Sequence, residues 1–148
     1  MTCGERDKLL TFMRQELYAV QASVSALGAP QAALVGVVVS ETFEVFFDTL
    51  AGSRKTINLR QNSAAAMVIG IAASGSERTV QLEGVAEEPR GEDLERLLEL
   101  YFARFPDGRT RQRSSGITYW RVSPTWLRYS DFSVDPPEIV EFNASDLA

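Results

Sequence analysis

The chain has 148 residues, of which 45% are apolar, and it carries a formal net charge of −5. This length predicts one domain over residues 1–148, because domains typically run to about 100 to 150 residues, and the acidic balance argues against a nucleic-acid partner, which would require a basic face. A single cysteine, Cys3, and the lack of histidine exclude an intrachain disulfide, a cysteine- or histidine-based metal site, and serine–histidine or cysteine–histidine catalysis.

The first 17 residues predict an amphipathic N-terminal helix that covers part of a larger structure. Within residues 5–16, apolar side chains recur at spacings of three and four among charged ones. The same segment has no apolar core of signal-peptide type, and no stretch of the chain approaches the ~20 apolar residues that cross a bilayer. We therefore expect a cytoplasmic protein that makes no membrane contact.

Short strands dominate the next 70 or so residues. A strand is expected where β-branched and apolar residues run together or alternate between turn residues. The strands predicted on this basis span residues 18–25, 32–39, 44–49, 64–72 and 79–87. Turns are expected at residues 27–30 and 74–76, and a short helix over residues 53–61 connects the third strand to the fourth.

A second amphipathic helix is predicted over residues 92–105, after a break at Pro89-Arg90-Gly91. Two further strands follow it, at residues 116–122 and 125–131, separated by Ser123-Pro124. The tail, residues 132–148, is expected to add one extended piece at residues 138–142 before its polar end frays.

The order of these elements predicts the fold class. Short strands are interrupted by a few helices, and no regular alternation of strand and helix runs through the chain. This arrangement indicates a mainly β fold, an antiparallel barrel with flanking helices. A closed sheet also hides the edges that such apolar strands would otherwise expose.

The junction between the third strand and the short helix gathers groups that bind anions. Ser53 is a good N-cap residue, and the amides of the first helical turn carry the positive end of the helix dipole. Arg54 adds a planar fork that can grip two phosphate oxygens, and Lys55 adds a mobile point charge. Thr49 supplies one more hydroxyl at the end of the strand. Together these residues predict a phosphate site.

Thr49 with Ser53-Arg54-Lys55 resembles the flavin mononucleotide (FMN) phosphate motif of the pyridoxamine 5'-phosphate oxidase-like family, the FMN-binding split barrels. The likeness covers most of residues 18–131 in the family's order. Further matching segments are Asn58-Leu59, residues 64–71, residues 79–84, Leu100-Tyr101-Phe102, residues 119–122 and residues 124–129. Because a Ser-Arg-Lys tripeptide alone matches by chance, the weight of the resemblance comes from its place between a strand and a helix within this order.

The resemblance implies an antiparallel split β-barrel that forms a homodimer, with the flavin between two subunits. The cofactor-binding residues that it implies are Ala33, Leu34, Val35, Gly36, Asp48, Thr49, Ser53, Arg54, Lys55, Thr79, Gln81, Tyr129 and Ser130, and no metal ligand is expected. The first four would meet the isoalloxazine ring through the strand backbone, and Asp48, Thr79 and Gln81 would lie near the flavin ring. A late strand of the partner would cover the ring with Trp126, Arg128, Tyr129 and Ser130. Trp120, Trp126 and Tyr129 are expected to serve the core or the dimer interface and not catalysis.

The function that the resemblance implies is flavin-dependent oxidoreduction of a small molecule. True pyridoxamine phosphate oxidases use a histidine and a substrate-binding lysine that have no counterpart here, so their activity is not expected, although Tyr101 matches a substrate-contacting tyrosine. One alternative is a reductase that binds the deazaflavin F420. The arginines at positions 104, 109, 111 and 113 are expected to form a solvated loop, and in this alternative they would hold the longer anionic tail of F420. Another alternative is a non-catalytic flavin or haem-related binding module.

Overall fold

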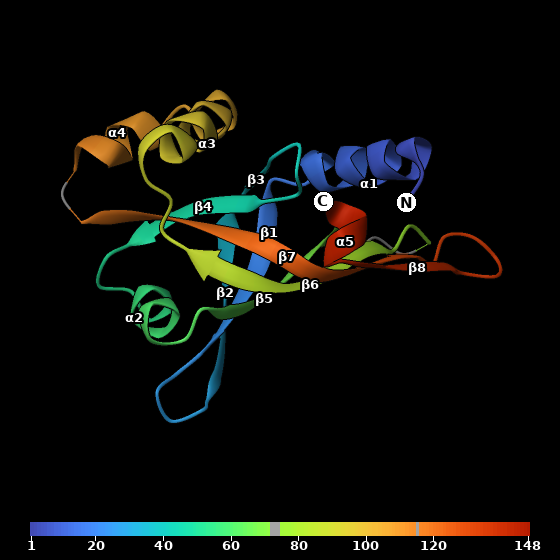
Figure 1. The fold of residues 1–148 in the computed structure, drawn as a ribbon, viewed down its shortest axis with the longest axis horizontal. Coiled ribbons are helices and arrows are strands. Elements are labelled where there is room, and N and C mark those ends of the chain that lie inside the picture. Colours follow the sequence, from blue (N-terminus) through green and yellow to red (C-terminus); the bar gives the residue numbers. More distant parts are fainter. Residues whose placement is uncertain (72–74, 115) are drawn as a thin grey trace.

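The structure, a computed structural model, describes residues 1–71, 75–114 and 116–148, and it consists of a sheet flanked by helices (Figure 1). The strands are β1 (Tyr18–Val24), β2 (Pro30–Gly36), β3 (Val38–Val39), β4 (Val45–Leu50), β5 (Ala64–Ile71), β6 (Arg78–Glu87), β7 (Ile117–Asp131) and β8 (Glu138–Asn143). The helices are α1 (Cys3–Gln15), α2 (Arg54–Gln61), α3 (Gly91–Arg104), α4 (Gly108–Arg113) and α5 (Ala144–Leu147).

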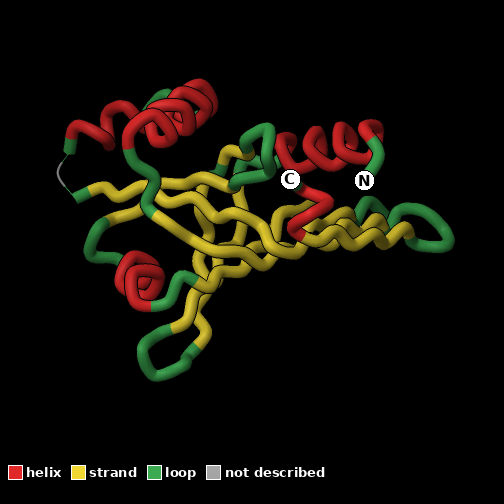
Figure 2. The backbone as a smooth tube through the Cα atoms, in the orientation of Figure 1, coloured by secondary structure: helices red, strands yellow, loops and turns green. Residues whose placement is uncertain are grey.

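The strands follow the order β2-β1-β5-β6-β7-β4-β3, and β8 pairs with the C-terminal half of β7. Each of these pairings is antiparallel. Figure 2 shows how the sheet curls on itself, and its inner side chains form the main apolar core. This core includes Met67, Ile69, Val80, Leu82, Val122 and Leu127. The structure therefore confirms the predicted mainly β, antiparallel fold with flanking helices.

Strand β4 contributes to two apolar clusters because successive side chains of a strand point to opposite faces. Phe47 belongs to the core inside the curled sheet. Phe46 packs on the other face, under α3, where its ring centroid lies 5.6 Å from that of Tyr101. The same alternation places Thr49 on the face of Phe47 and Asp48 on the face of Phe46.

The strand predicted over residues 32–39 is wrong in its continuity, because the structure divides it into β2 and β3. Strand β2 pairs with β1, whereas β3 pairs with β4. The chain changes partner at Val37, whose amide donates to the carbonyl of Leu17 at 2.9 Å. Gly36 lies at this bend, and a Cβ there would come within 3.0 Å of the Phe105 ring. An apolar, β-branched run predicts a strand but does not reveal where it changes partner.

The two strands predicted on either side of Ser123-Pro124 are one continuous strand, β7. Proline lacks an amide hydrogen and is expected to interrupt a ladder of hydrogen bonds. The strand continues because the β6–β7 register shifts just before Gly84, which leaves Thr125 as an extra residue in a bulge. A Cβ at Gly84 would lie 2.4 Å from the Ser123 carbonyl oxygen, so glycine is required beside the bulge.

Helices α1, α2 and α3 confirm the three predicted helices within a few residues, and two short helices were not expected. Residues read as a loop form α4, and the end of the tail, predicted to fray, forms α5. Asn143 caps α5, since its Oδ1 accepts from the amides of Ser145 and Asp146 at 2.9 and 3.2 Å. The predicted end of the fourth strand at residue 72 and the start of the turn at residue 74 lie outside the described residues. Within the described ranges, no helix combines the length and apolarity needed to cross a membrane.

Candidate functional site

The predicted anion-binding junction forms between β4 and α2. Ser53 caps α2, because its Oγ accepts from the amide of Thr56 at 3.3 Å. The Ser53 hydroxyl also lies 3.2 Å from Thr49 Oγ1 and 3.1 Å from Thr56 Oγ1, which donates to the last carbonyl of β4 at 2.9 Å. These hydroxyls therefore build the turn itself. The donors left over are the amides of Arg54 and Lys55, since first-turn amides have no acceptor within their own helix.

Strand β7 supports this turn from the side of the sheet. Thr118 Oγ1 donates to the carbonyl of Thr49 at 3.1 Å and lies 3.3 Å from Thr56 Oγ1. The indole nitrogen of the buried Trp120 donates to Thr118 Oγ1 at 3.3 Å. Trp120 is thus a core residue, one of the two roles that the sequence allowed for it.

Arg54 and Lys55 supply the positive charge of the junction. Among the residues that the structure describes, neither has a carboxylate oxygen within 4.0 Å. Arg54 Nε donates to Gln31 Oε1 at 3.1 Å. Asn58 Nδ2 donates to the same oxygen at 2.8 Å and to Ser23 Oγ at 3.0 Å. A polar network on β1, β2 and α2 therefore holds Arg54 in place.

These side chains border a hollow of about 250 Å³. The residues that line it are Gln21, Ser23, Gln31, Ala32, Ala33, Arg54 and Lys55. Gln21 is only 1% exposed, and its Nε2 donates to the carbonyl of Ala22 at 2.7 Å. Its Oε1 is buried without a hydrogen-bond partner in the described part of the chain. The hollow is thus cationic on the α2 side and bordered by small alanine side chains on the β2 side.

Sequence reasoning finds Ala33, Arg54 and Lys55 in this hollow but misses the polar residues contributed by β1 and β2. One signal for β1 was present in the sequence. The inward positions of that strand begin with the apolar Ala19 and continue with Gln21 and Ser23. Polar residues at positions that an ordinary core strand would fill with apolar ones indicate a wall of a polar site.

The other β2 residues of the predicted set have side chains outside this hollow. Leu34 is 67% exposed and is paired with Val20 in the β1–β2 register. Val35 packs in the core, and Gly36 lies against Phe105. The predicted contacts of these residues use backbone groups, and they stay a prediction.

Asp48 faces α4 instead of the hollow. Its Oδ2 accepts from Arg111 Nε at 2.9 Å, and Arg111 also pairs with Asp107 and donates to the Tyr101 hydroxyl at 3.2 Å. Burial and the nearby Asp48 charge raise the pKa of the Tyr101 phenol. Burial also raises the pKa of Tyr119, whose hydroxyl has no hydrogen-bond partner within the described ranges.

The remaining predicted residues lie on β6 and β7 and do not line the hollow. Gln81 is exposed and borders a separate hollow of about 160 Å³. Thr79 is paired with the buried Ser130 in the β6–β7 register. Tyr129 is buried under α1, with its ring edge-to-face to Phe12 at 5.5 Å. That a partner subunit presents the β7 residues to a flavin stays a prediction.

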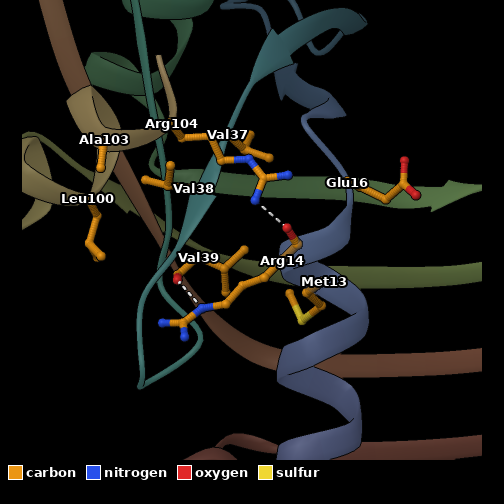
Figure 3. A pocket seen from close by; sticks show the side chains of 9 residues that line it. All are labelled: Met13, Arg14, Glu16, Val37, Val38, Val39, Leu100, Ala103 and Arg104. Carbon is orange, nitrogen blue, oxygen red and sulfur yellow. Dashed lines mark hydrogen bonds between the residues drawn. The ribbon is translucent and has the colours of Figure 1, made fainter. Parts of the chain in front are cut away.

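Three arginines at the end of α3 and on α4, Arg104, Arg109 and Arg111, are engaged in internal contacts. Arg104 donates to the carbonyls of Arg14 and Gln15 at the C-terminal end of α1, beside a hollow of about 470 Å³ (Figure 3). Arg111 is held by the carboxylates described above, and Arg109 lies over an aromatic ring of α3 at 4.7 Å. Figure 3 also shows that the hollow has valine, leucine and alanine side chains in its lining, together with the charged Arg14 and Glu16. Arg104 therefore caps α1 with its two terminal nitrogens, while its buried Nε has no hydrogen-bond partner in the described part of the chain.

Comparisons with known proteins address the family and the fold. A model of the pyridoxamine 5'-phosphate oxidase family matches residues 6–131. A comparison with curated proteins finds no match. The matched span includes the hollow and the whole of the β4–α2 junction.

Solved structures resemble the chain over most of its length. A heme binding protein from Mycobacterium smegmatis has a TM-score of 0.84 at 14% identity. The match covers 99% of this chain but only 61% of that protein. HutZ, the heme storage protein from Vibrio cholerae, has a TM-score of 0.70 at 16% identity over 80% of this chain and 88% of that one. A pyridoxamine 5'-phosphate oxidase-related, FMN binding protein from Nostoc punctiforme has a TM-score of 0.65 at 12% identity, with 94% and 85% covered.

These identities are low, so the structural likeness establishes the fold alone. The family model covers most of the chain, and the curled antiparallel sheet is that of the similar structures. The chain belongs to the pyridoxamine 5'-phosphate oxidase family and has its split-barrel fold.

Proposed function

We propose that the protein binds flavin mononucleotide in the hollow beside α2. The observation that carries the proposal is the pair Arg54 and Lys55, two cations at a helix N-terminus that have no carboxylate partner among the described residues. A phosphate monoester carries a charge of about −1.5 to −2 at neutral pH. Two cations and the free first-turn amides balance that charge without a metal ion.

The rest of the hollow fits a planar ring with a polar edge. Ala32 and Ala33 leave space on one wall, while Gln21 and Ser23 offer hydrogen-bonding groups on another. A haem fits less well, because its iron is normally held by histidine, cysteine, methionine or tyrosine, and the hollow has none of these in its lining. The donor set therefore favours a flavin, although two of the similar structures are heme proteins.

A second copy of the chain is the partner that we propose for the outer face of β2, β1 and β5. Leu34, Val20 and Val68 form a row across these strands and are 67%, 42% and 44% exposed. A parallel row consists of Ala32, Ala22 and Ala66. A contiguous exposed apolar patch is typical of an interaction surface. Because β2 carries both this face and one wall of the hollow, a partner chain packed here would help to cover the ring.

We further propose that the protein is a flavin-dependent oxidoreductase of a small molecule. A bound flavin supplies hydride and electron transfer, whereas the protein binds and orients the reactants and excludes water. The hollow has no carboxylate in its lining, which suits hydride delivery without a side-chain acid. Tyr101 is already bonded to Arg111, and this supports a substrate other than pyridoxamine phosphate.

The test is the flavin content of the purified or reconstituted protein. We expect one FMN per chain, seen as the visible absorption band of a bound flavin. The double variant Arg54→Ala with Lys55→Ala should be colourless while its far-ultraviolet circular dichroism is unchanged. A folded wild-type protein that takes up no FMN, or a double variant that retains it, would contradict the proposal.

Two further measurements separate the alternatives. Mass spectrometry of the released cofactor distinguishes FMN from F420, whose longer tail would need anion contacts beyond α2. The engagement of Arg104 and Arg111 in internal contacts supports FMN. Oxidation of NADH or NADPH by the loaded protein, with turnover on a quinone or oxygen, is the result expected of an enzyme, whereas retention of the flavin without turnover identifies a carrier or sensor.

A further inference from the structure

We propose that Gln31 is a positioning residue that gives this site its preference for a phosphorylated ligand over the same ligand without phosphate. The inference rests on the proposed function and adds a residue to it that does not itself belong to the strand-to-helix junction. Gln31 lies on β2 and lines the hollow. It acts through Arg54, the residue whose guanidinium would grip the phosphate.

The hydrogen bonds fix the orientation of the Gln31 amide. Arg54 Nε can only donate, so the Gln31 atom 3.1 Å from it must be the oxygen. Asn58 Nδ2 donates to that same oxygen at 2.8 Å and uses its other hydrogen on Ser23 Oγ at 3.0 Å. Both lone pairs of the Gln31 oxygen and both amide hydrogens of Asn58 are therefore used, and neither amide can be reversed without losing a bond.

The position of the contact on Arg54 matters for phosphate binding. Gln31 takes the Nε hydrogen and leaves the two terminal nitrogens, for which the structure gives no protein partner in its described part. A guanidinium uses paired N–H groups to grip two oxygens of one phosphate. An unsupported arginine would lose rotamer freedom on binding. The hydrogen bond from Arg54 Nε to Gln31 already restricts the side chain and therefore lowers this cost.

The support extends from the surface into the core. Arg54 is exposed and Gln31 is half-buried, whereas Asn58 and Ser23 are only 5% and 3% exposed. A surface arginine without a binding role requires no such chain of side chains behind it. These successive contacts indicate that Gln31, Asn58 and Ser23 fix the direction in which the Arg54 guanidinium points.

The experiment compares FMN with riboflavin, which has the same ring and no phosphate. Flavin fluorescence titrations should show that Gln31→Leu raises the Kd of FMN about tenfold, the effect of weakening one charge-assisted contact, and changes the Kd of riboflavin less than about twofold. The matched control is Gln61→Leu, which alters an exposed glutamine at the other end of α2 and should change neither value.

A double-mutant cycle tests whether Gln31 acts through Arg54. In an Arg54→Ala background, Gln31→Leu should cause no further loss of FMN affinity, since residues that act as one unit are non-additive. Additive losses, or an equal loss of riboflavin binding in Gln31→Leu, would overturn the inference while the phosphate site stands. A wild-type protein that binds riboflavin as tightly as FMN would overturn the proposed phosphate site, and the inference with it.

Discussion

Two regions of this chain are rich in cations and differ in what the fold does with them. The end of α3 and helix α4 carry Arg104, Arg109, Arg111 and Arg113, whereas the β4–α2 junction carries only two basic residues. In the first region the fold engages Arg104 with carbonyls, Arg109 with an aromatic ring and Arg111 with carboxylates. At the junction no carboxylate approaches either cation within the described ranges. Within the described ranges Arg111 is the arginine of the first region that pairs with a carboxylate, whereas Arg104 is held by carbonyls. The comparison teaches that cations at a helix N-terminus, with terminal nitrogens left free, mark an anion site better than the number of basic residues does.

A third group of charges is paired with carboxylates, as Arg111 is. Glu44, with 11% of its side chain exposed, accepts from Arg96 at 3.0 Å and from Arg121 at 2.9 Å, and so ties α3 to the sheet. Compensated charges of this kind are expected to contribute to stability, whereas the charges of the junction are expected to contribute to binding.

The largest expected effect lies at the junction. Arg54→Ala with Lys55→Ala should weaken FMN binding at least about 100-fold, because two charge-assisted contacts of about 1.5 to 3 kcal/mol each are lost. The free energy of unfolding should change by less than about 0.5 kcal/mol, as for most surface substitutions. Fluorescence titration and urea denaturation measure the two quantities.

The charge-matched control is Arg109→Ala with Arg113→Ala, which removes the same number of positive charges from α4. It should leave FMN affinity within about twofold. An equal loss of affinity in this control would show that FMN responds to net charge and not to the junction, and the contrast between the two regions would fail.

The next effect concerns stability alone. Glu44→Gln removes one of the two carboxylates that Arg96 and Arg121 share and leaves them Asp93, and we expect it to lower the free energy of unfolding by about 1 to 2 kcal/mol. FMN affinity should not change, because Glu44 does not line the hollow. Urea denaturation at pH 7 gives the first value, and a drop in FMN affinity measured on the folded variant would contradict the separation of the two roles.

The pH dependence of stability sharpens this prediction. Burial alone would raise the pKa of Glu44, but the hydrogen bonds from Arg96 and Ser40 and the charge of Arg121 outweigh it and hold the pKa below 4.5. A carboxyl whose pKa is lowered by folding stabilises the protein above its unfolded pKa and loses that contribution as the pH falls through the folded pKa. The difference in free energy of unfolding between wild type and Glu44→Gln should therefore be largest at pH 6 to 7 and decrease below about pH 4.5. A difference that is constant with pH would contradict this account.

The smallest expected effect is that of Asp48→Asn. The Asp48–Arg111 pair is partly exposed, at 15% and 36% of the two side chains, so its loss should cost only about 1 kcal/mol of stability. FMN affinity should be unchanged if Asp48 serves α4 alone. A loss of FMN affinity at unchanged stability would instead support the predicted role of Asp48 beside the flavin.

Local patterns predicted the parts of this molecule that local physics determines. The cap at Ser53, the cations behind it and the strand before it occupy consecutive positions, so one stretch of sequence describes the junction. The break at Val37 and the continuity of β7 through Pro124 depend on which strand lies alongside, and no local pattern contains that information. Helix α4 shows the same limit, because its arginines are typical of a solvated loop until the partner Asp48, 63 residues away from Arg111, is known.

The polar side of the hollow could not be predicted from the sequence for the same reason. Gln31 and Asn58 are 27 residues apart, and Asn58 and Ser23 are 35 residues apart. Their contacts exist only because α2 packs beside β1 and β2. Only the unusual polarity of Gln21 and Ser23 on an inward face pointed to this wall, and it indicated a polar site without naming its partners.

The support that β7 gives to the junction sets the order in which the site can mature. Thr118 donates to the carbonyl of a residue 69 positions earlier, and closing so long a loop costs conformational entropy before the contact is made. A chain emerging from the ribosome therefore completes its anion site only after the β7 segment has been synthesised and has docked beside β4. A ligand stabilises only the state that binds it. Binding of the coenzyme would therefore stabilise the pairing of β4 with β7 and slow the separation of these two strands.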